Sequence, residues 1–194
     1  MKALLRATGE LTMAHAGDII ENPISGAQLK FLKTSRDTNG ELVQVDFWMK
    51  PFGRGTGGGD HIHPQQEERA TILEGRLSYH RSGEKREAAS GEIVSLPPGV
   101  SHYLYNNHPE PLHMIVEFRP ALNTEHFWEK IFELGRQGKL RPNGNPNLLQ
   151  LAVLMNAFPD ETYSAGIPVW LQKLVFNLLA PIGRAFGRTV YVEE

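Results

Sequence analysis

Two histidines and a nearby acid in the stretch GTGGGDHIHPQQEERATILEG, residues 55 to 75, have the types and spacing of metal ligands. His61 and His63 are two positions apart, so on a β-strand both side chains point to the same face. The turn that begins at Pro64 brings the chain back, and Glu68 would begin the returning strand. A carboxylate at that position can meet both imidazoles, so the spacing favours a cation site between two strands.

A third histidine, His102, follows the turn Pro97-Pro98-Gly99 and leads another short strand. The sequence contains no cysteine, so any metal must be held by nitrogen or oxygen. Three neutral imidazoles and one carboxylate suit a divalent transition metal, and an octahedral ion would keep about two positions open for water, substrate or dioxygen. His61, His63, Glu68 and His102 would together make such a site.

Two longer motifs surround these residues. The first, G(X)5HXH(X)3–4E(X)6G, is matched by Gly55, His61, His63, Glu68 and Gly75, and the second, G(X)5PXG(X)2H(X)3N, by Gly91, Pro97, Gly99, His102 and Asn106. Through both motifs the sequence resembles the cupin superfamily over roughly residues 25 to 120. The resemblance implies that His61, His63, Glu68 and His102 are the metal ligands, with Glu67 as the alternative acid.

The whole chain also resembles a group of bacterial single-domain cupin proteins of similar length. The shared stretches are PQQEER, PNLLQLAVL and LLAPIGRAFG. This resemblance implies the fold and the metal site, and it does not imply one particular reaction.

The first two-thirds of the sequence has the pattern of short strands separated by Gly and Pro turns. LVQVDFWMK (42–50) alternates between apolar and other residues, and the Asn39-Gly40 turn predicts a hairpin with 28–35. Ser82-Gly83 predicts a second hairpin. We therefore expect an all-β fold, and the resemblance specifies a double-stranded β-helix, the jelly-roll or cupin barrel.

After Pro120 the periodicity becomes helical, and helices are expected within 123–139, 146–158 and 167–183. The first carries an apolar stripe of Phe127, Trp128, Ile131, Phe132 and Leu134. This predicts three parts: an N-terminal arm (1–24), a cupin β-barrel (25–120) and a helical C-terminal extension (121–194).

Composition limits the class of protein. A chain of 194 residues suits one domain, and the formal charge of −2 gives no reason to expect nucleic acid as a partner. The apolar residues 3–5 are too few for a signal-peptide core, and a cysteine-free chain fits the cytoplasm.

The apolar C-terminal stretch is too short and too interrupted to span a bilayer. We expect residues 168–188 to pack on the barrel or on a partner subunit, or to cover the barrel mouth. Contact with a membrane surface is a weaker alternative, suggested by Lys173, Arg184 and Arg188. The family resemblance implies a homodimer.

Two further candidates for catalysis lie in LHMIVEF (112–118). His113 and Glu117 share one face of this predicted strand, whereas Leu112, Met114, Val116 and Phe118 share the other. If the polar face looks into the barrel, His113 or Glu117 acts as an acid or base beside Glu68 and the metal. If it looks outward, both are exposed residues, and the apolar face is the better core candidate.

These patterns lead to two hypotheses on function. The first is an enzyme that acts on a small organic molecule at a mononuclear centre of three His and one Glu. Dioxygenase chemistry with Fe(II) is favoured by the resemblance, isomerase or decarboxylase chemistry comes next, and Mn, Ni, Co or Zn are alternative metals. The second is a non-catalytic cupin module that binds a small ligand or a metal.

Overall fold

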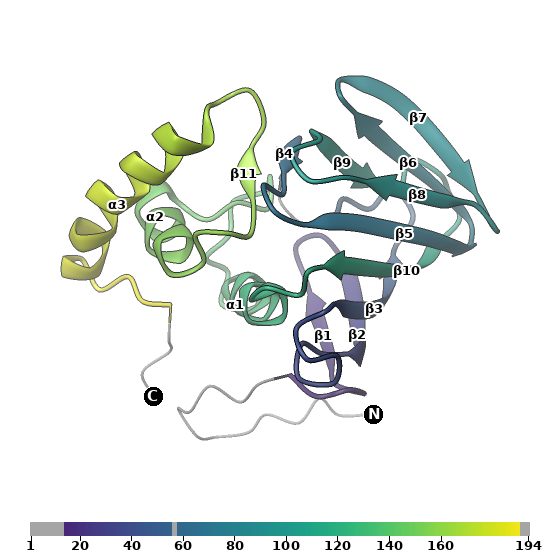
Figure 1. Cartoon of the computed structure of the whole chain (residues 1–194), viewed down its shortest axis with the longest axis horizontal. Coiled ribbons are helices and arrows are strands. Elements are labelled where there is room, and N and C mark those ends of the chain that lie inside the picture. Colours follow the sequence, from purple (N-terminus) through teal and green to yellow (C-terminus); the bar gives the residue numbers. More distant parts are fainter. Residues whose placement is uncertain (1–13, 56–57, 191–194) are drawn as a thin grey trace.

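Two antiparallel β-sheets and a group of helices make up the computed structural model, which describes residues 14–55 and 58–190 (Figure 1). Within those residues, the first sheet has the order β1 (Ile19–Asn22), β2 (Ala27–Lys33), β3 (Val43–Met49), β10 (Leu112–Arg119), β5 (Glu67–Glu74) and β8 (Ile93–Leu96). The second sheet has the order β11 (Tyr163–Ser164), β4 (His61–Ile62), β9 (His102–Tyr105), β6 (Arg76–Arg81) and β7 (Glu84–Ala89). The predicted jelly-roll fold is confirmed.

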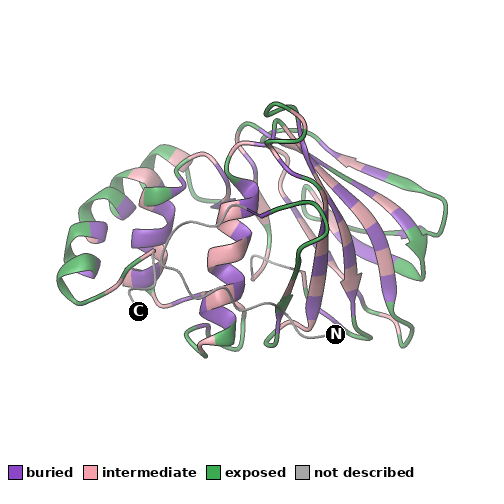
Figure 2. Ribbon diagram, turned by 90° about the horizontal axis from the view of Figure 1, so that it is seen from below, coloured by how far each residue is buried: buried purple, intermediate pink, exposed green. Residues whose placement is uncertain are grey.

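The alternating patterns place one face of each long strand in the core. Along β3, Val43, Val45, Phe47 and Met49 are buried, as the sequence predicted, and the residues between them are half-buried. The same alternation runs along β10, where the even-numbered residues from Leu112 to Phe118 face inward. Figure 2 shows these strands banded by burial. The inward faces of both strands therefore form the floor of the space between the sheets.

Both predicted hairpins are present. β2 pairs antiparallel with β3 across the loop that contains Asn39 and Gly40, which have positive φ angles of 52° and 81°. β6 pairs with β7 through Ser82 and Gly83, at 52° and 83°. The left-handed conformation of these turn residues explains why Asn, Ser and Gly stand there.

The predicted helices are confirmed as α1 (Thr124–Arg136), α2 (Leu148–Ala157) and α3 (Val169–Ala185). α1 packs its apolar stripe against the first sheet, where the Trp128 ring meets Phe118 edge-on at 4.9 Å. α2 and α3 pack on each other, and at Gly183 a Cβ would lie 2.8 Å from the Leu149 carbonyl oxygen. Glycine at this position therefore allows the two helices to approach closely.

Two strands lie outside the region expected to be the barrel. β1 belongs to the segment expected as an N-terminal arm, yet it pairs with β2, so the first sheet begins earlier than the pattern suggested. β11 belongs to the C-terminal extension, yet it pairs with β4 in the second sheet. Residues 1–13 of the expected arm lie outside the described residues. The three-part division stays a prediction.

α3 exposes a wide apolar face. Trp170, Leu174, Leu178, Ile182 and Phe186 follow one another at four-residue spacing and are all exposed. Its opposite face is buried through Gln172, Phe176, Ala180 and Gly183. In Figure 2 the outer side of this helix is largely exposed. None of the helices in the described part of the chain is long and apolar enough to cross a membrane.

We expect Gly75→Ala to lower the free energy of unfolding by more than Gly91→Ala. Both glycines have positive φ, 80° and 88°, a conformation that costs a residue with a side chain roughly 1–2 kcal/mol. At Gly75 an added Cβ would also lie 2.4 Å from the Pro111 carbonyl oxygen, whereas nothing lies within 4 Å at Gly91. Urea denaturation followed by circular dichroism measures both losses. Equal losses would contradict the importance of the close approach.

Candidate metal centre

Four side chains from three strands converge at one end of the space between the sheets. His61 begins β4, His63 follows its last residue, Glu68 lies on β5, and His102 begins β9. His61 and His102 are direct partners across the β4–β9 pairing, which the sequence could not show. Each of the four residues offers a ligand atom, and these atoms all lie within 4.8 Å of one another. The structure therefore brings together the residues selected from the two motifs.

The Glu68 carboxylate is the centre of this cluster. Its Oε2 lies 3.0 Å from His102 Nε2 and 3.5 Å from His63 Nε2. The His61 ring is 4.5 Å from the His102 ring and 5.2 Å from the His63 ring, measured between centroids. His63, Glu68 and His102 are buried, and His61 is half-buried.

Backbone carbonyl groups fix the orientation of all three imidazoles. The Nδ1 atoms of His61, His63 and His102 donate to the carbonyl oxygens of Gly59 (3.0 Å), Glu161 (2.7 Å) and Val100 (2.8 Å). Because a carbonyl oxygen can only accept, each Nδ1 carries a hydrogen. In the neutral ring the lone pair then lies on Nε2. This is the outer-sphere arrangement that metal-binding histidines usually have.

The protonation of the cluster follows from burial and from the carboxylate. Burial and the neighbouring imidazoles lower the pKa of His61 to about 3, so this ring is neutral. Burial would raise the pKa of Glu68, but hydrogen bonds from His102 and His63 outweigh it and hold the pKa below its usual range. Burial also opposes a charge on His102, yet its hydrogen bond to Glu68 raises the pKa of this ring.

The donor set fits a divalent transition metal. It consists of three imidazole nitrogens and one ionised carboxylate, which are ligands of the kind preferred by iron, manganese, nickel, cobalt and zinc. A cation in the cluster would replace the proton on His102 as the partner of the Glu68 carboxylate. The cluster could therefore hold one metal ion, and the chemistry of its ligands does not select among these metals.

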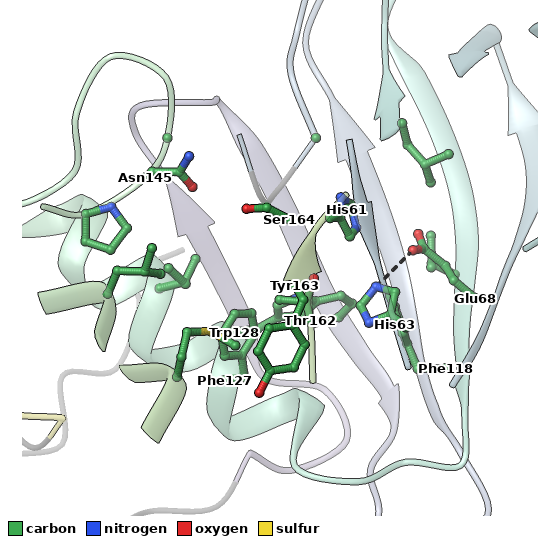
Figure 3. Close-up of a pocket in the computed structure, with 18 of the residues that line it drawn as sticks. His61, His63, Glu68, Phe118, Phe127, Trp128, Asn145, Thr162, Tyr163 and Ser164 are labelled. Carbon is green, nitrogen blue, oxygen red and sulfur yellow. Dashed lines mark ion pairs between the residues drawn. The ribbon is translucent and has the colours of Figure 1, made fainter. Parts of the chain in front are cut away.

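A cavity of about 110 Å³ opens beside the cluster. His61, His63 and Glu68 form one end of its wall, and Figure 3 shows these residues facing Tyr163, Phe127 and Trp128. The remaining wall comes from the inward faces of β3 and β10 and from α1, α2, α3 and β11. The C-terminal extension thus supplies one side of the cavity, as the alternative that it covers the barrel mouth suggested.

A buried polar network ties this extension to the cluster. Glu161, whose carbonyl accepts from His63, also accepts through its carboxylate from Asn123 N (2.7 Å) and Thr124 Oγ1 (2.9 Å) at the start of α1. Gln66, between His63 and Glu68, donates from Nε2 to Thr124 Oγ1 at 2.7 Å. The position of one histidine therefore depends on residues more than fifty positions away.

His113 and Glu117 do not reach the cluster. They lie on the opposite face of β10 from Met114, Val116 and Phe118, which line the cavity. His113 stacks on Trp48 and donates from Nε2 to Asp46 at 2.5 Å, while Glu117 accepts from Gln44 at 2.8 Å. These contacts lie on the outer face of the sheet, so the expected roles of His113 and Glu117 as acid or base at the centre receive no support from their positions.

Several residues of the cavity were not singled out from the sequence. Asn145 lies in a loop and Ser164 in the two-residue strand β11, where no periodicity marks them. The same holds for Glu161, which bonds to His63 but does not line the cavity. Tyr163 also lines the cavity, but its hydroxyl donates to the Pro159 carbonyl at 2.7 Å, and burial raises its pKa to about 12. Tyr163 is therefore a wall residue and not a proton donor at neutral pH.

The sandwich of two antiparallel sheets with a His-His-Glu-His cluster at one end defines a double-stranded β-helix with a candidate metal site. Residues 51–118 match the family model of the cupin domain. The expected resemblance is confirmed. No curated protein is significantly similar to the chain.

Solved structures similar to part of the chain include the following three. A protein with a double-stranded β-helix domain from Klebsiella pneumoniae has 22% identity and a TM-score of 0.41, covering 47% of this chain and 75% of its own. KdgF from a Halomonas species has 22% identity and a TM-score of 0.42, covering 49% and 79%. A predicted oxalate decarboxylase from Thermotoga maritima has 18% identity and a TM-score of 0.45, covering 48% and 80%.

We expect His102→Ala and Glu68→Gln to abolish high-affinity binding of a divalent metal. Each removes one ligand and leaves the partner atoms of a buried cluster unsatisfied. His113→Ala, on the outer face of β10, is the matched control and should bind the metal as the wild type does. Calorimetric titration of the metal-free proteins with Co(II) or Zn(II) measures the affinities. Unchanged binding in both ligand variants would rule out this cluster as the site.

Proposed function

We propose that this protein is a metal-dependent enzyme that converts a small organic molecule at a mononuclear centre held by His61, His63, Glu68 and His102. The observation that carries this proposal is the set of three Nδ1–carbonyl hydrogen bonds, which orient three imidazoles about one carboxylate. The adjoining cavity supports it, because a bound molecule would lie against the cluster. We also propose a cytoplasmic location, which the cysteine-free sequence supports.

Dioxygenase chemistry with Fe(II) is the favoured reaction class, followed by isomerase or decarboxylase chemistry. When bound, the metal supplies Lewis acidity or activates dioxygen. The chain's own residues orient the ligand atoms, and the largely apolar wall would contact the body of a bound molecule. Glu68 is the only carboxylate among the described residues of that wall, so it is the carboxylate that a bound molecule would meet beside the metal.

One feature favours the alternative of a non-catalytic binding module. Apart from the cluster and Tyr163, the described residues that line the cavity include no side chain that titrates. An enzyme with this site therefore depends on the metal and Glu68 for its chemistry. A protein that only binds its ligand needs no further titrating side chain in the cavity wall.

We expect the purified protein to contain about one transition-metal ion per chain, and the Fe(II)-loaded form to consume oxygen with phenols or β-diketones. Elemental analysis and an oxygen electrode measure these quantities. His61→Ala should lose both metal and turnover, whereas Glu117→Ala should keep both. If no metal restores turnover while these molecules still bind, the binding module is the correct reading.

We propose further that the exposed face of α3 pairs with α3 of a second copy. The face is large: Trp170, Leu178 and Phe186 are 68%, 65% and 70% exposed. Buried aromatic side chains each contribute about 150–250 Å², and monomers rarely expose patches above roughly 300–600 Å². With the neighbouring aliphatic residues, this face approaches the roughly 800 Å² that each partner buries in a standard interface.

The arrangement of the face supports a second copy over a membrane surface. Residues at four-residue spacing form a ridge that can pack into the matching grooves of an identical helix. Two of the three cations beside it are engaged within the chain, because Lys173 pairs with Asp160 at 3.3 Å and Arg184 donates to Asn156. Lys173 and Arg184 therefore already have partners in the chain in place of the anionic head groups of a lipid surface.

Leu178→Glu should convert a dimer into a monomer, because two charges would be buried at the centre of the paired helices. Ile93→Glu, at an exposed apolar residue of β8, is the matched control and should leave the dimer intact. Sedimentation equilibrium measures the mass of each form. A monomeric wild type would refute the pairing, and co-sedimentation with anionic vesicles would assign the face to a membrane.

A further inference from the structure

We propose that the cavity beside the cluster selects a small, uncharged molecule that has an apolar body and its oxygen atoms at one end, and that it rejects molecules with a phosphate or carboxylate on the body. The inference rests on the proposed function, because the oxygen-bearing end is taken to meet the metal cluster. It names a class of ligand that the cupin fold does not specify.

The wall of the cavity offers no cation to an anionic ligand. Among the described residues that line the cavity there is no lysine or arginine, and Glu68, His61 and His63 are its only ionisable groups besides Tyr163. An anionic group held away from the cluster would therefore be buried without a cation to pair with. Burial of an unpaired charge is unfavourable by several kcal/mol, so such ligands are selected against.

Most of the side chains that line the cavity are apolar. Phe118 and Met114 come from β10, Phe127 and Trp128 from α1, Met155 from α2, and Phe176 from α3. The wall is continuous with the cluster, because the Phe118 ring meets His63 edge-on at 5.3 Å and Trp128 at 4.9 Å. A flat or aromatic molecule that reaches the cluster would lie against these rings.

Two polar side chains, Ser164 and Asn145, line the cavity near the cluster. Ser164 is the direct partner of His61 across the β4–β11 pairing, so its side chain lies on the same face as the imidazole. Gln172 holds Ser164 in place by bonding both its N–H (3.1 Å) and its carbonyl (3.0 Å). Figure 3 shows Ser164 next to His61 and Asn145 along the same side of the cavity.

The hydroxyl of Ser164 and the amide of Asn145 are available to a ligand. Neither side chain has a hydrogen-bond partner among the described residues. The Asn145 amide packs closely on Gly58, because glycine has no Cβ; an added Cβ there would lie 2.5 Å from the Asn145 amide nitrogen. Both groups can therefore bind the oxygen-bearing end of a molecule, while most of the remaining wall is apolar.

The size of the cavity limits the molecule. A volume of about 110 Å³ compares with the roughly 10–15 Å³ that one water requires by the same measure, so the cavity has room for a small organic molecule.

The test is a matched pair of probes against the Co(II)-loaded wild type. Catechol and 3,4-dihydroxybenzoate present the same two hydroxyls, and only the second carries a carboxylate on the ring; 4-methylcatechol is the neutral control for size. Changes in the visible spectrum of Co(II) report binding without any turnover. We expect both catechols to bind at least about tenfold more tightly than the benzoate, because of the unpaired charge. Equal or tighter binding of the benzoate would overturn the inference.

A cation in the wall should reverse the preference. Leu151→Lys places an ammonium group at a lining residue of α2, whereas Leu148→Lys, at an exposed residue of the same helix, is the matched control. Only Leu151→Lys should improve the binding of the benzoate relative to catechol, by about tenfold if the charges pair. Failure of the benzoate to gain in a folded Leu151→Lys protein would also count against the inference.

The outcomes separate this inference from the proposed function. If Co(II) does not bind the wild type, the proposed metal centre is wrong. The same three probes are then titrated against the metal-free protein, with binding followed by quenching of tryptophan fluorescence. Preference for the catechols there would still support a cavity that rejects charge. If Co(II) binds and the benzoate is not disfavoured, the metal centre stands and the ligand class is wrong.

Discussion

Three backbone carbonyl groups, those of Gly59, Val100 and Glu161, control the centre of this protein. Each accepts from an imidazole Nδ1 and so decides which ring nitrogen is left for a cation. Gly59 and Val100 lie two residues before His61 and His102, in the loops that lead into β4 and β9. Their hydrogen bonds are therefore local to these two histidines. The third comes from the C-terminal extension, so the cluster is complete only when the helices are in place.

This dependence joins two parts of the chain that look separate in the sequence. The carbonyl of Glu161 fixes His63 while its carboxylate holds the first residues of α1, and Gln66 reaches the same threonine from the cluster side. Buried polar groups that satisfy one another in this way fix a single arrangement, because moving one leaves the others unpaired. The helices are thus part of the site and do not merely cover it.

The sequence predicted what depends on local periodicity. Alternation identified the inward face of β3, Asn39-Gly40 and Ser82-Gly83 identified hairpins, and the spacing of His61 and His63 placed both on one face. It could not predict contacts that depend on chain packing. β11 has two residues and no pattern, so the sequence could not show that Ser164 lies opposite His61. The alternation along β10 favoured its apolar face as the core face, but it left open whether His113 reached the cluster.

The two faces of α3 have different surroundings. Gln172 and Phe176 look toward the cavity, and Trp170, Leu174 and Leu178 look away from the chain. Because side chains on opposite sides of a helix do not touch, substitutions on one side are expected to add to those on the other without interaction. Substitutions in this one helix can therefore change the lining of the cavity without changing the exposed face, or change the exposed face without changing the lining.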